Sequence, residues 1–245
     1  MQKRVETGIS GLDKMLYGGI PDKNMVLISG GPGAGKTLLS FEFLYRNAKT
    51  GHKCIFFTLE EEPKQLVENV KSAFSEIKDI DDVIKSRALI VDEELSADRI
   101  VVSGTDDKSN IEFGNVMASI ESSISRFGAD RIVIDSISVL DIMIKDPALY
   151  RKYMFAMVTN LRRLGVTAMI TAELESPEKN RLTFRPEYFI FDGIIALYQS
   201  GEESKRLLTS EVLKMRGTRH SFVTTPYDIT PSGFRIFAVE DIAPY

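Results

Sequence analysis

The stretch Gly30-Gly31-Pro32-Gly33-Ala34-Gly35-Lys36-Thr37 matches the phosphate-binding loop pattern GxxxxGK[ST] at every position. Its glycines let the backbone curl so that successive N–H groups point at phosphate oxygens, at the positive end of a following helix. Lys36 adds a full charge that holds the β- and γ-phosphates, so we count it as catalytic, and the Thr37 hydroxyl is a ligand for Mg²⁺. The stretch predicts that the chain binds a nucleoside triphosphate with magnesium.

The flanking residues supply the strand and the helix that such a loop requires. Residues 25–29, Met-Val-Leu-Ile-Ser, form a short apolar run of strand length. After the loop, apolar side chains recur at helical spacing up to Gly51. An ordinary glycine-rich turn, which is the alternative, would need neither flank.

Composition limits the class of protein. The chain has 245 residues, of which 43% are hydrophobic, enough for a substantial core. Its 31 basic and 35 acidic residues give a net charge of −4, so no overall charge favours nucleic acid or an anionic membrane as partner. The amino terminus is polar, and no apolar run approaches membrane-spanning length. We therefore expect a cytoplasmic protein without membrane insertion.

Strand-length apolar runs alternate with amphipathic stretches along most of the chain, which predicts an α/β fold with a mostly parallel sheet flanked by helices. Further strands are expected at 53–59, 88–91, 131–135 and 166–171, and further helices from Pro63, at 111–127 and at 147–164. The polar stretch Ser103 to Asn110 is interpreted as a mobile loop.

The end of the chain has a different pattern. Short strands are expected at 194–198, 206–215, 221–227 and 233–239, joined by turns such as Gly201-Glu202-Glu203. They predict a C-terminal antiparallel β-meander that closes the domain. Since no linker or repeat is visible, we expect one domain over residues 1–245.

Acidic residues follow two of the expected strands, at the edge where open α/β sheets bind their ligands. Asp135 ends the run Ile132-Val133-Ile134, where a carboxylate is needed to orient magnesium or its water shell. Glu60 and Glu61 follow the strand that ends at Leu59 and are candidates for the base that polarises the attacking water. The residues themselves leave open which of the two does so.

Several motifs together resemble a single KaiC-type domain; KaiC, the circadian clock ATPase, belongs to the RecA superfamily. The resemblance covers essentially the whole chain, in the expected order: Thr7-Gly8-Ile9, Gly11-Leu12-Asp13, Gly18-Gly19-Ile20-Pro21, the phosphate loop, Thr58-Leu59-Glu60-Glu61, Ile134-Asp135-Ser136, Thr171-Ala172-Glu173 and Lys214-Met215-Arg216-Gly217-Thr218-Arg219-His220.

The resemblance implies a RecA-like P-loop NTPase core that assembles as a homohexameric ring, with ATP held between neighbouring subunits. Glu60 and Glu61 match the family's catalytic carboxylates, and the segment of Lys214 and Arg216 matches the one that reaches a neighbour's γ-phosphate. Two cations at alternate strand positions face the same side, and an arginine finger stabilises the charge of phosphoryl transfer. We place His220 with them, the alternative being a surface histidine without such a role.

The chain departs from the family at two points. The autophosphorylating domain of KaiC has a Ser-Thr pair where this chain has Tyr188 and Phe189, so autokinase activity is not expected. Asn24 stands where the family often has Gly, and because Asn tolerates left-handed backbone this changes little.

These features favour a ring-forming ATPase that uses its nucleotide state to change contacts with neighbours or with an unidentified protein partner. One alternative is a recombinase-like DNA-binding ATPase. Its DNA-contacting loop would be Leu174 to Pro186. This segment contains the basic residues Lys179, Arg181 and Arg185 and the acidic residues Glu175 and Glu178, and a net charge of +1 is a weak basis for phosphate binding. The other is a regulatory nucleotide-binding module with negligible turnover.

Overall fold

The computed structural model describes residues 3–92, 106–174, 186–200 and 207–237. Its centre is a nine-stranded sheet with the order β11-β10-β9-β8-β3-β7-β6-β4-β5. The strands are β3 (Met25–Gly30), β4 (Cys54–Thr58), β5 (Leu89–Asp92), β6 (Arg131–Asp135), β7 (Thr167–Glu173), β8 (Gly193–Ser200), β9 (Leu207–Met215), β10 (Thr225–Thr230) and β11 (Gly233–Ile236). A separate two-stranded sheet pairs β1 (Arg4–Val5) with β2 (Ile20–Pro21).

Strands β5, β4, β6, β7, β3 and β8 run parallel, and β8 to β11 continue as an antiparallel meander. The parallel strands are buried along almost their whole length because helices cover both faces. This arrangement confirms the predicted RecA-like α/β class, including its C-terminal meander.

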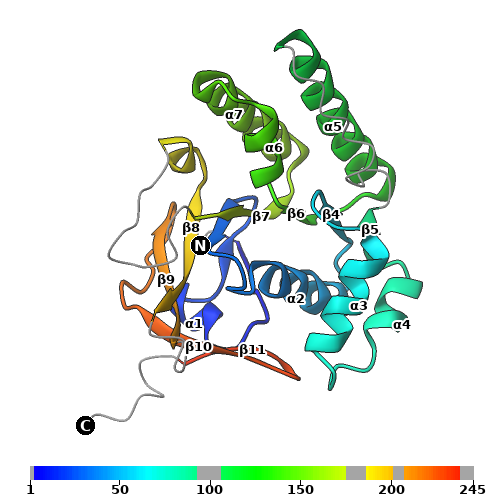
Figure 1. The fold of residues 1–245 in the computed structure, drawn as a ribbon. Coiled ribbons are helices and arrows are strands. Elements are labelled where there is room, and N and C mark those ends of the chain that lie inside the picture. Colours follow the sequence, from blue (N-terminus) through cyan, green and yellow to red (C-terminus); the bar gives the residue numbers. More distant parts are fainter. Residues whose placement is uncertain (1–2, 93–105, 175–185, 201–206, 238–245) are drawn as a thin grey trace.

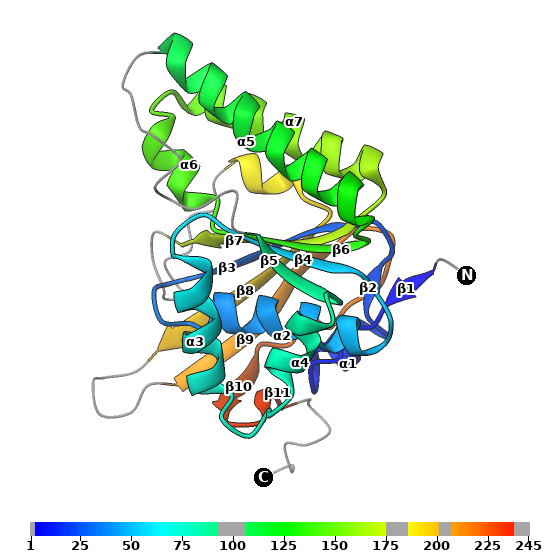
Figure 2. The same ribbon diagram turned by 90° about the vertical axis from the view of Figure 1, so that its right-hand side faces the viewer.

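Helices form a layer on each face of the sheet, as Figures 1 and 2 show. One layer contains α5 (Asp106–Phe127), α6 (Ser138–Met143) and α7 (Pro147–Leu164); the other contains α1 (Leu12–Met15), α2 (Lys36–Lys49), α3 (Pro63–Ala73) and α4 (Ile80–Lys85). A short 3₁₀ helix, η3 (Pro186–Ile190), precedes β8. Two hydrophobic clusters fill the two sides of the sheet. None of the described helices is long and apolar enough to cross a membrane.

Two expected boundaries are wrong. Helix α5 begins at Asp106, so the part of the expected loop over 106–110 is helical, and 103–105 lie outside the described residues. Acidic residues in a first helical turn are favoured by the helix dipole, which explains a helix start without apolar periodicity. Strand β10 begins at Thr225 rather than Ser221, whose N–H donates to the Met15 carbonyl instead of to a strand partner.

Sequence patterns also missed the shortest elements, since β1, β2, α1, α4, α6 and η3 span too few residues to show a period. The expected turn Gly201-Glu202-Glu203 lies outside the described residues.

The contact of the amino-terminal segment with β11 yields a stability prediction. Gly11 has a φ of +85°, and a Cβ there would lie 2.0 Å from the Ile236 carbonyl oxygen. Gly11→Ala should lower the free energy of unfolding by more than about 1 kcal/mol. In contrast, Gly114→Ala in α5, where a Cβ meets open space, should raise it by about 0.5–1 kcal/mol. Urea unfolding of both variants tests this, and equal responses would contradict it.

Candidate functional site

The phosphate loop joins β3, which ends at Gly30, to α2, which begins at Lys36. Gly33 and Gly35 adopt left-handed backbone, with φ of +75° and +84°. That conformation is accessible to glycine without steric cost and turns the chain sharply into the helix. The free N–H groups at the start of α2 therefore face the edge of the sheet where the parallel strands end.

Lys36 is the cation of this site. Its side chain is 9% exposed, and its Nζ donates to the carbonyl oxygens of Gly30 at 3.0 Å and Gly31 at 3.1 Å. Burial lowers the pKa of Lys36, while the nearby carboxylates of Glu173, Asp135 and Glu60 act in the opposite direction. The ammonium thus lies among three carboxylates that favour its charged form.

Asp135 lies at the end of β6 and meets the first turn of α2. Its Oδ2 accepts a hydrogen bond of 2.7 Å from the Thr37 hydroxyl, and its Oδ1 accepts one from the Thr171 hydroxyl. The residue is 4% exposed, and burial raises the pKa of its carboxyl group, with the two threonine hydrogen bonds opposing the shift. The predicted pair of Thr37 and Asp135 is therefore in direct contact.

This donor set fits magnesium bound together with a nucleotide. Mg²⁺ binds hard oxygen ligands, and in such sites one or two protein oxygens are completed by phosphate oxygens and water. Thr37 and Asp135 offer a hydroxyl and a carboxylate of this kind. Among the described residues no group of three or more His, Cys, Asp or Glu side chains could hold a metal by itself.

The two candidate bases have different hydrogen-bond partners. Burial raises the pKa of Glu60, whose carboxyl group bonds the Ser136 side chain and interacts with Asp135, Glu173 and Lys36. In contrast, Glu61 Oε2 accepts a hydrogen bond of 2.9 Å from Asn69 on α3. Glu61 also interacts with Asp135, so both carboxylates act on the site, and they differ in their hydrogen-bond partners.

Glu173 and Ser136 are site residues that we did not assign from the sequence. Glu173 ends β7, directly opposite Gly30 in the parallel register, and Ser136 follows Asp135. Both residues belong to motifs of the family resemblance. The position of Glu173 at the end of an expected strand could have marked it as a site residue.

Lys214 and Arg216 lie away from the phosphate loop of the same chain. Lys214 pairs with Ile194, three residues before Leu197, which is opposite Gly30. This displaces Lys214 by roughly 10 Å along the strands toward the opposite edge of the sheet. Its Nζ donates to the carbonyl oxygens of Phe189 (3.0 Å) and Phe191 (2.6 Å).

Arg216 and His220 follow β9 in the chain. The Arg216 guanidinium donates to the Phe189 carbonyl at 3.2 Å. His220 hydrogen-bonds through Nδ1 to the Ser221 carbonyl, and its ring lies 4.6 Å from that of Phe222. The structure thus brings Lys36, Thr37, Asp135 and Glu60 together but leaves Lys214, Arg216 and His220 outside their cluster.

At the positions of the family's Ser-Thr pair, Tyr188 is buried and donates to the Glu173 carbonyl, and Phe189 is 57% exposed. The three cations of the possible DNA loop, Lys179, Arg181 and Arg185, lie outside the described residues.

A phosphate loop between the central strand β3 and helix α2, with Asp135 at the end of β6, two strands away in the sheet, defines a P-loop NTPase with a RecA-like fold. The model of the KaiC ATPase family matches residues 5–241, so the chain belongs to the KaiC ATPase family.

Individual relatives agree with this membership. The chain is 34% identical to a UPF0273 protein of Thermotoga maritima, with 98% of each chain covered, and 32% identical to the UPF0273 protein MJ1359 of Methanocaldococcus jannaschii, with 96% of each covered. It is 30% identical to the circadian clock oscillator protein KaiC of Rippkaea orientalis over 96% of this chain and 44% of that protein. The crystal structure of a KaiC-like protein from Pyrococcus horikoshii superposes with a TM-score of 0.80 at 28% identity, covering 97% of this chain and all of that one.

The contact between Thr37 and Asp135 yields a prediction about metal-dependent binding. Thr37→Val removes the hydroxyl but keeps the branched shape, so it should weaken ATP binding in Mg²⁺ by about tenfold or more. Without Mg²⁺ the affinity should change by less than about twofold, because the loop amides and Lys36 remain. Thr37→Ser, which retains the hydroxyl, is the control. Calorimetric titration measures all three proteins, and an equal loss with and without Mg²⁺ would contradict this role.

Proposed function

We propose that this protein is an ATPase that forms a homo-oligomeric ring, with each active site shared between two subunits, and that its nucleotide state regulates contacts with neighbours or with a partner protein. The observation that carries the proposal is the separation, within one chain, of the phosphate loop from the two cations expected to act on the γ-phosphate. The phosphate loop lies at one edge of the sheet, and Lys214 and Arg216 lie toward the other. These cations therefore complete a site only if they belong to an adjacent subunit.

In this proposal the loop amides and Lys36 bind and orient the β- and γ-phosphates. Thr37 and Asp135 hold magnesium, which when bound neutralises charge on the phosphates. Glu60 is assigned as the base that accepts a proton from the attacking water. Both Glu60 and Glu61 interact with Asp135, but Glu60 also interacts with Lys36, and Glu61 accepts a hydrogen bond from Asn69. Lys214 and Arg216 of the neighbour stabilise the charge that develops on the transferred phosphoryl group, with His220 beside them.

Mixing two inactive variants tests the shared site. Glu60→Gln impairs the half of the site that contains the phosphate loop, and Arg216→Ala impairs the half that the neighbour contributes. Each variant alone should therefore hydrolyse ATP very slowly. In an equal mixture that exchanges subunits at random, about one quarter of interfaces would combine two intact halves. Phosphate release should recover to about that fraction of the wild-type rate.

Sedimentation of the same samples provides the control, because recovery requires mixed oligomers. A strictly monomeric wild-type protein with full ATPase activity would disprove the shared site. An oligomer that binds ATP without releasing phosphate, alone or with partners, would instead favour the regulatory module with negligible turnover.

The environment of Glu60 predicts a pH dependence. Burial raises the pKa of its carboxyl group, and a base must be deprotonated to accept a proton. Activity should therefore fall as pH decreases through this raised pKa, at a higher pH than an exposed glutamate would give. The profile of kcat/KM between about pH 5 and 8 measures this. The residual activity of Glu60→Gln should lack that acidic limb; an unchanged limb would assign it to another group.

A further inference from the structure

Two side chains from the meander hold the phosphate loop by its carbonyl oxygens. The Tyr227 hydroxyl, on β10, donates to the Ala34 carbonyl at 2.7 Å. Gln199 Nε2, on β8, donates to the Pro32 carbonyl at 3.2 Å. Both contacts join residues far apart in the chain, so they exist only once the meander has packed beside the loop.

Holding a carbonyl also sets the direction of the next N–H, because the peptide unit is planar and its C=O and N–H point in opposite directions when it is trans. The Ala34 carbonyl shares its peptide plane with the Gly35 N–H, and the Pro32 carbonyl shares its plane with the Gly33 N–H. No described residue accepts a hydrogen bond from either N–H. These are amides that a bound phosphate would use.

Glycine by itself cannot hold these planes, since it populates many backbone conformations with little preference. At Gly35 the surroundings restrict the chain further. A Cβ there would lie 2.6 Å from Ile229 Cδ1 and 2.9 Å from Phe234 Cζ, both on the hairpin of β10 and β11. The hairpin thus packs directly against the last turn of the loop.

Tyr227 is suited to a fixed role. Its side chain is 4% exposed, and its ring stacks on that of Phe234 with the centroids 5.3 Å apart. Burial raises the pKa of the phenol, which keeps the hydroxyl protonated and able to donate.

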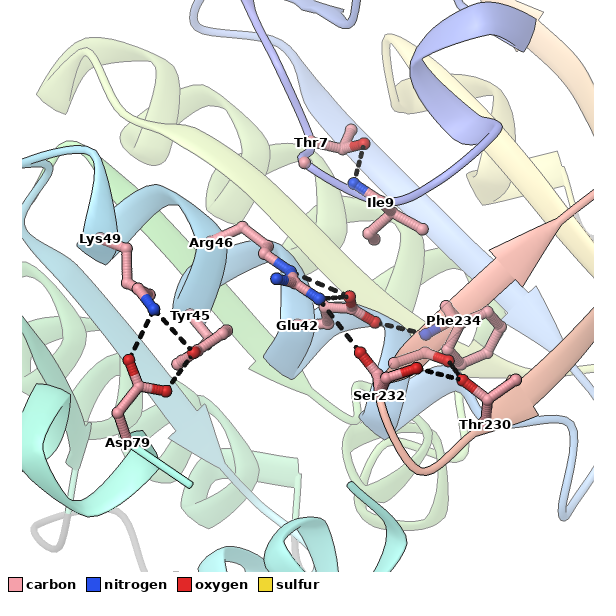
Figure 3. A network of polar contacts seen from close by, with 12 residues as sticks. Thr7, Ile9, Glu42, Tyr45, Arg46, Lys49, Asp79, Thr230, Ser232 and Phe234 are labelled. Atoms are coloured by element: carbon pink, nitrogen blue, oxygen red, sulfur yellow. Dashed lines mark hydrogen bonds and ion pairs between the residues drawn. The ribbon is translucent and has the colours of Figure 1, made fainter. Parts of the chain in front are cut away.

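The same hairpin is attached to the helix that follows the loop, as Figure 3 shows. The Phe234 N–H donates to the buried carboxylate of Glu42 on α2 at 2.6 Å, and Arg46 donates to the Ser232 carbonyl at 3.2 Å. The hairpin therefore contacts both the phosphate loop and the helix that follows it.

We propose that Tyr227 is a positioning residue for nucleotide binding. Its hydroxyl holds the Ala34 carbonyl pointing away from the bound phosphates, so that the Gly35 N–H of the same peptide unit points toward them. Gln199 does the same, through a more exposed contact, for the Gly33 N–H. This role rests on the proposed nucleotide function of the loop. It makes the C-terminal meander a part of the phosphate site rather than an extension of the sheet.

Tyr227→Phe is the direct test, because it removes the hydroxyl and keeps the ring. Tyr198→Phe is the matched control: Tyr198 is also a buried tyrosine of the meander, 1% exposed, but its hydroxyl contacts Glu211. The affinity of full-length protein for ATP and ADP should fall by about tenfold in Tyr227→Phe, the effect of one ordinary hydrogen bond, and by less than about twofold in Tyr198→Phe.

Hydrogen–deuterium exchange without nucleotide separates positioning from general stability. Amides of residues 30–37 should exchange faster in Tyr227→Phe than in wild-type protein and Tyr198→Phe. Gln199→Ala, a change at a half-exposed side chain, provides a second variant should Tyr227→Phe unfold, and it should weaken ATP binding by a smaller factor.

Each outcome decides one proposal. Loop exchange and ATP affinity in Tyr227→Phe within about twofold of wild type would overturn the positioning role. So would an equal loss of affinity in Tyr198→Phe. Failure of the wild-type protein to bind ATP would overturn the proposed function, and the exchange comparison would still decide whether Tyr227 holds the loop.

Discussion

The parallel pairing of β3 between β7 and β8 is the constraint on which the site depends. It places Gly30 opposite Glu173 on one side and Leu197 on the other. Because parallel strands end at the same edge, the residues after β3, β4, β6 and β7 converge there without any sequence proximity. A one-residue slip of β3 would move the loop and exchange the faces of its side chains.

Electrostatics distinguish the site from the core around it. The carboxylates of Asp135, Glu60 and Glu173 all interact with the ammonium of Lys36, so carboxylates outnumber the cation. Burial raises the pKa of Asp135 and Glu60, because burial disfavours the charged form of a carboxyl group. Such groups are retained at functional sites, where they are arranged for a charged ligand rather than for stability.

Sequence patterns predicted much of this arrangement because its signals are local. The loop motif, the strand before it and the helix after it lie within 25–51, and the structure places Thr37 against Asp135 as their chemistry requires. The start of α5 and that of β10 were misplaced, since both depend on contacts or charges that carry no periodic pattern. The sequence does not predict which of Glu60 and Glu61 acts as the base, because that depends on side-chain contacts such as the one between Glu61 and Asn69.

The sequence alone determined the α/β class, the phosphate loop and the carboxylates at strand ends, because glycine spacing and hydrophobic periodicity act over a few neighbouring residues. Only the tertiary structure placed Glu173 beside the loop, Lys214 toward the opposite edge and the Tyr227 hydroxyl on Ala34, a contact between residues 193 positions apart. Such contacts follow from the order and register of the strands, which long-range packing decides and no local pattern records.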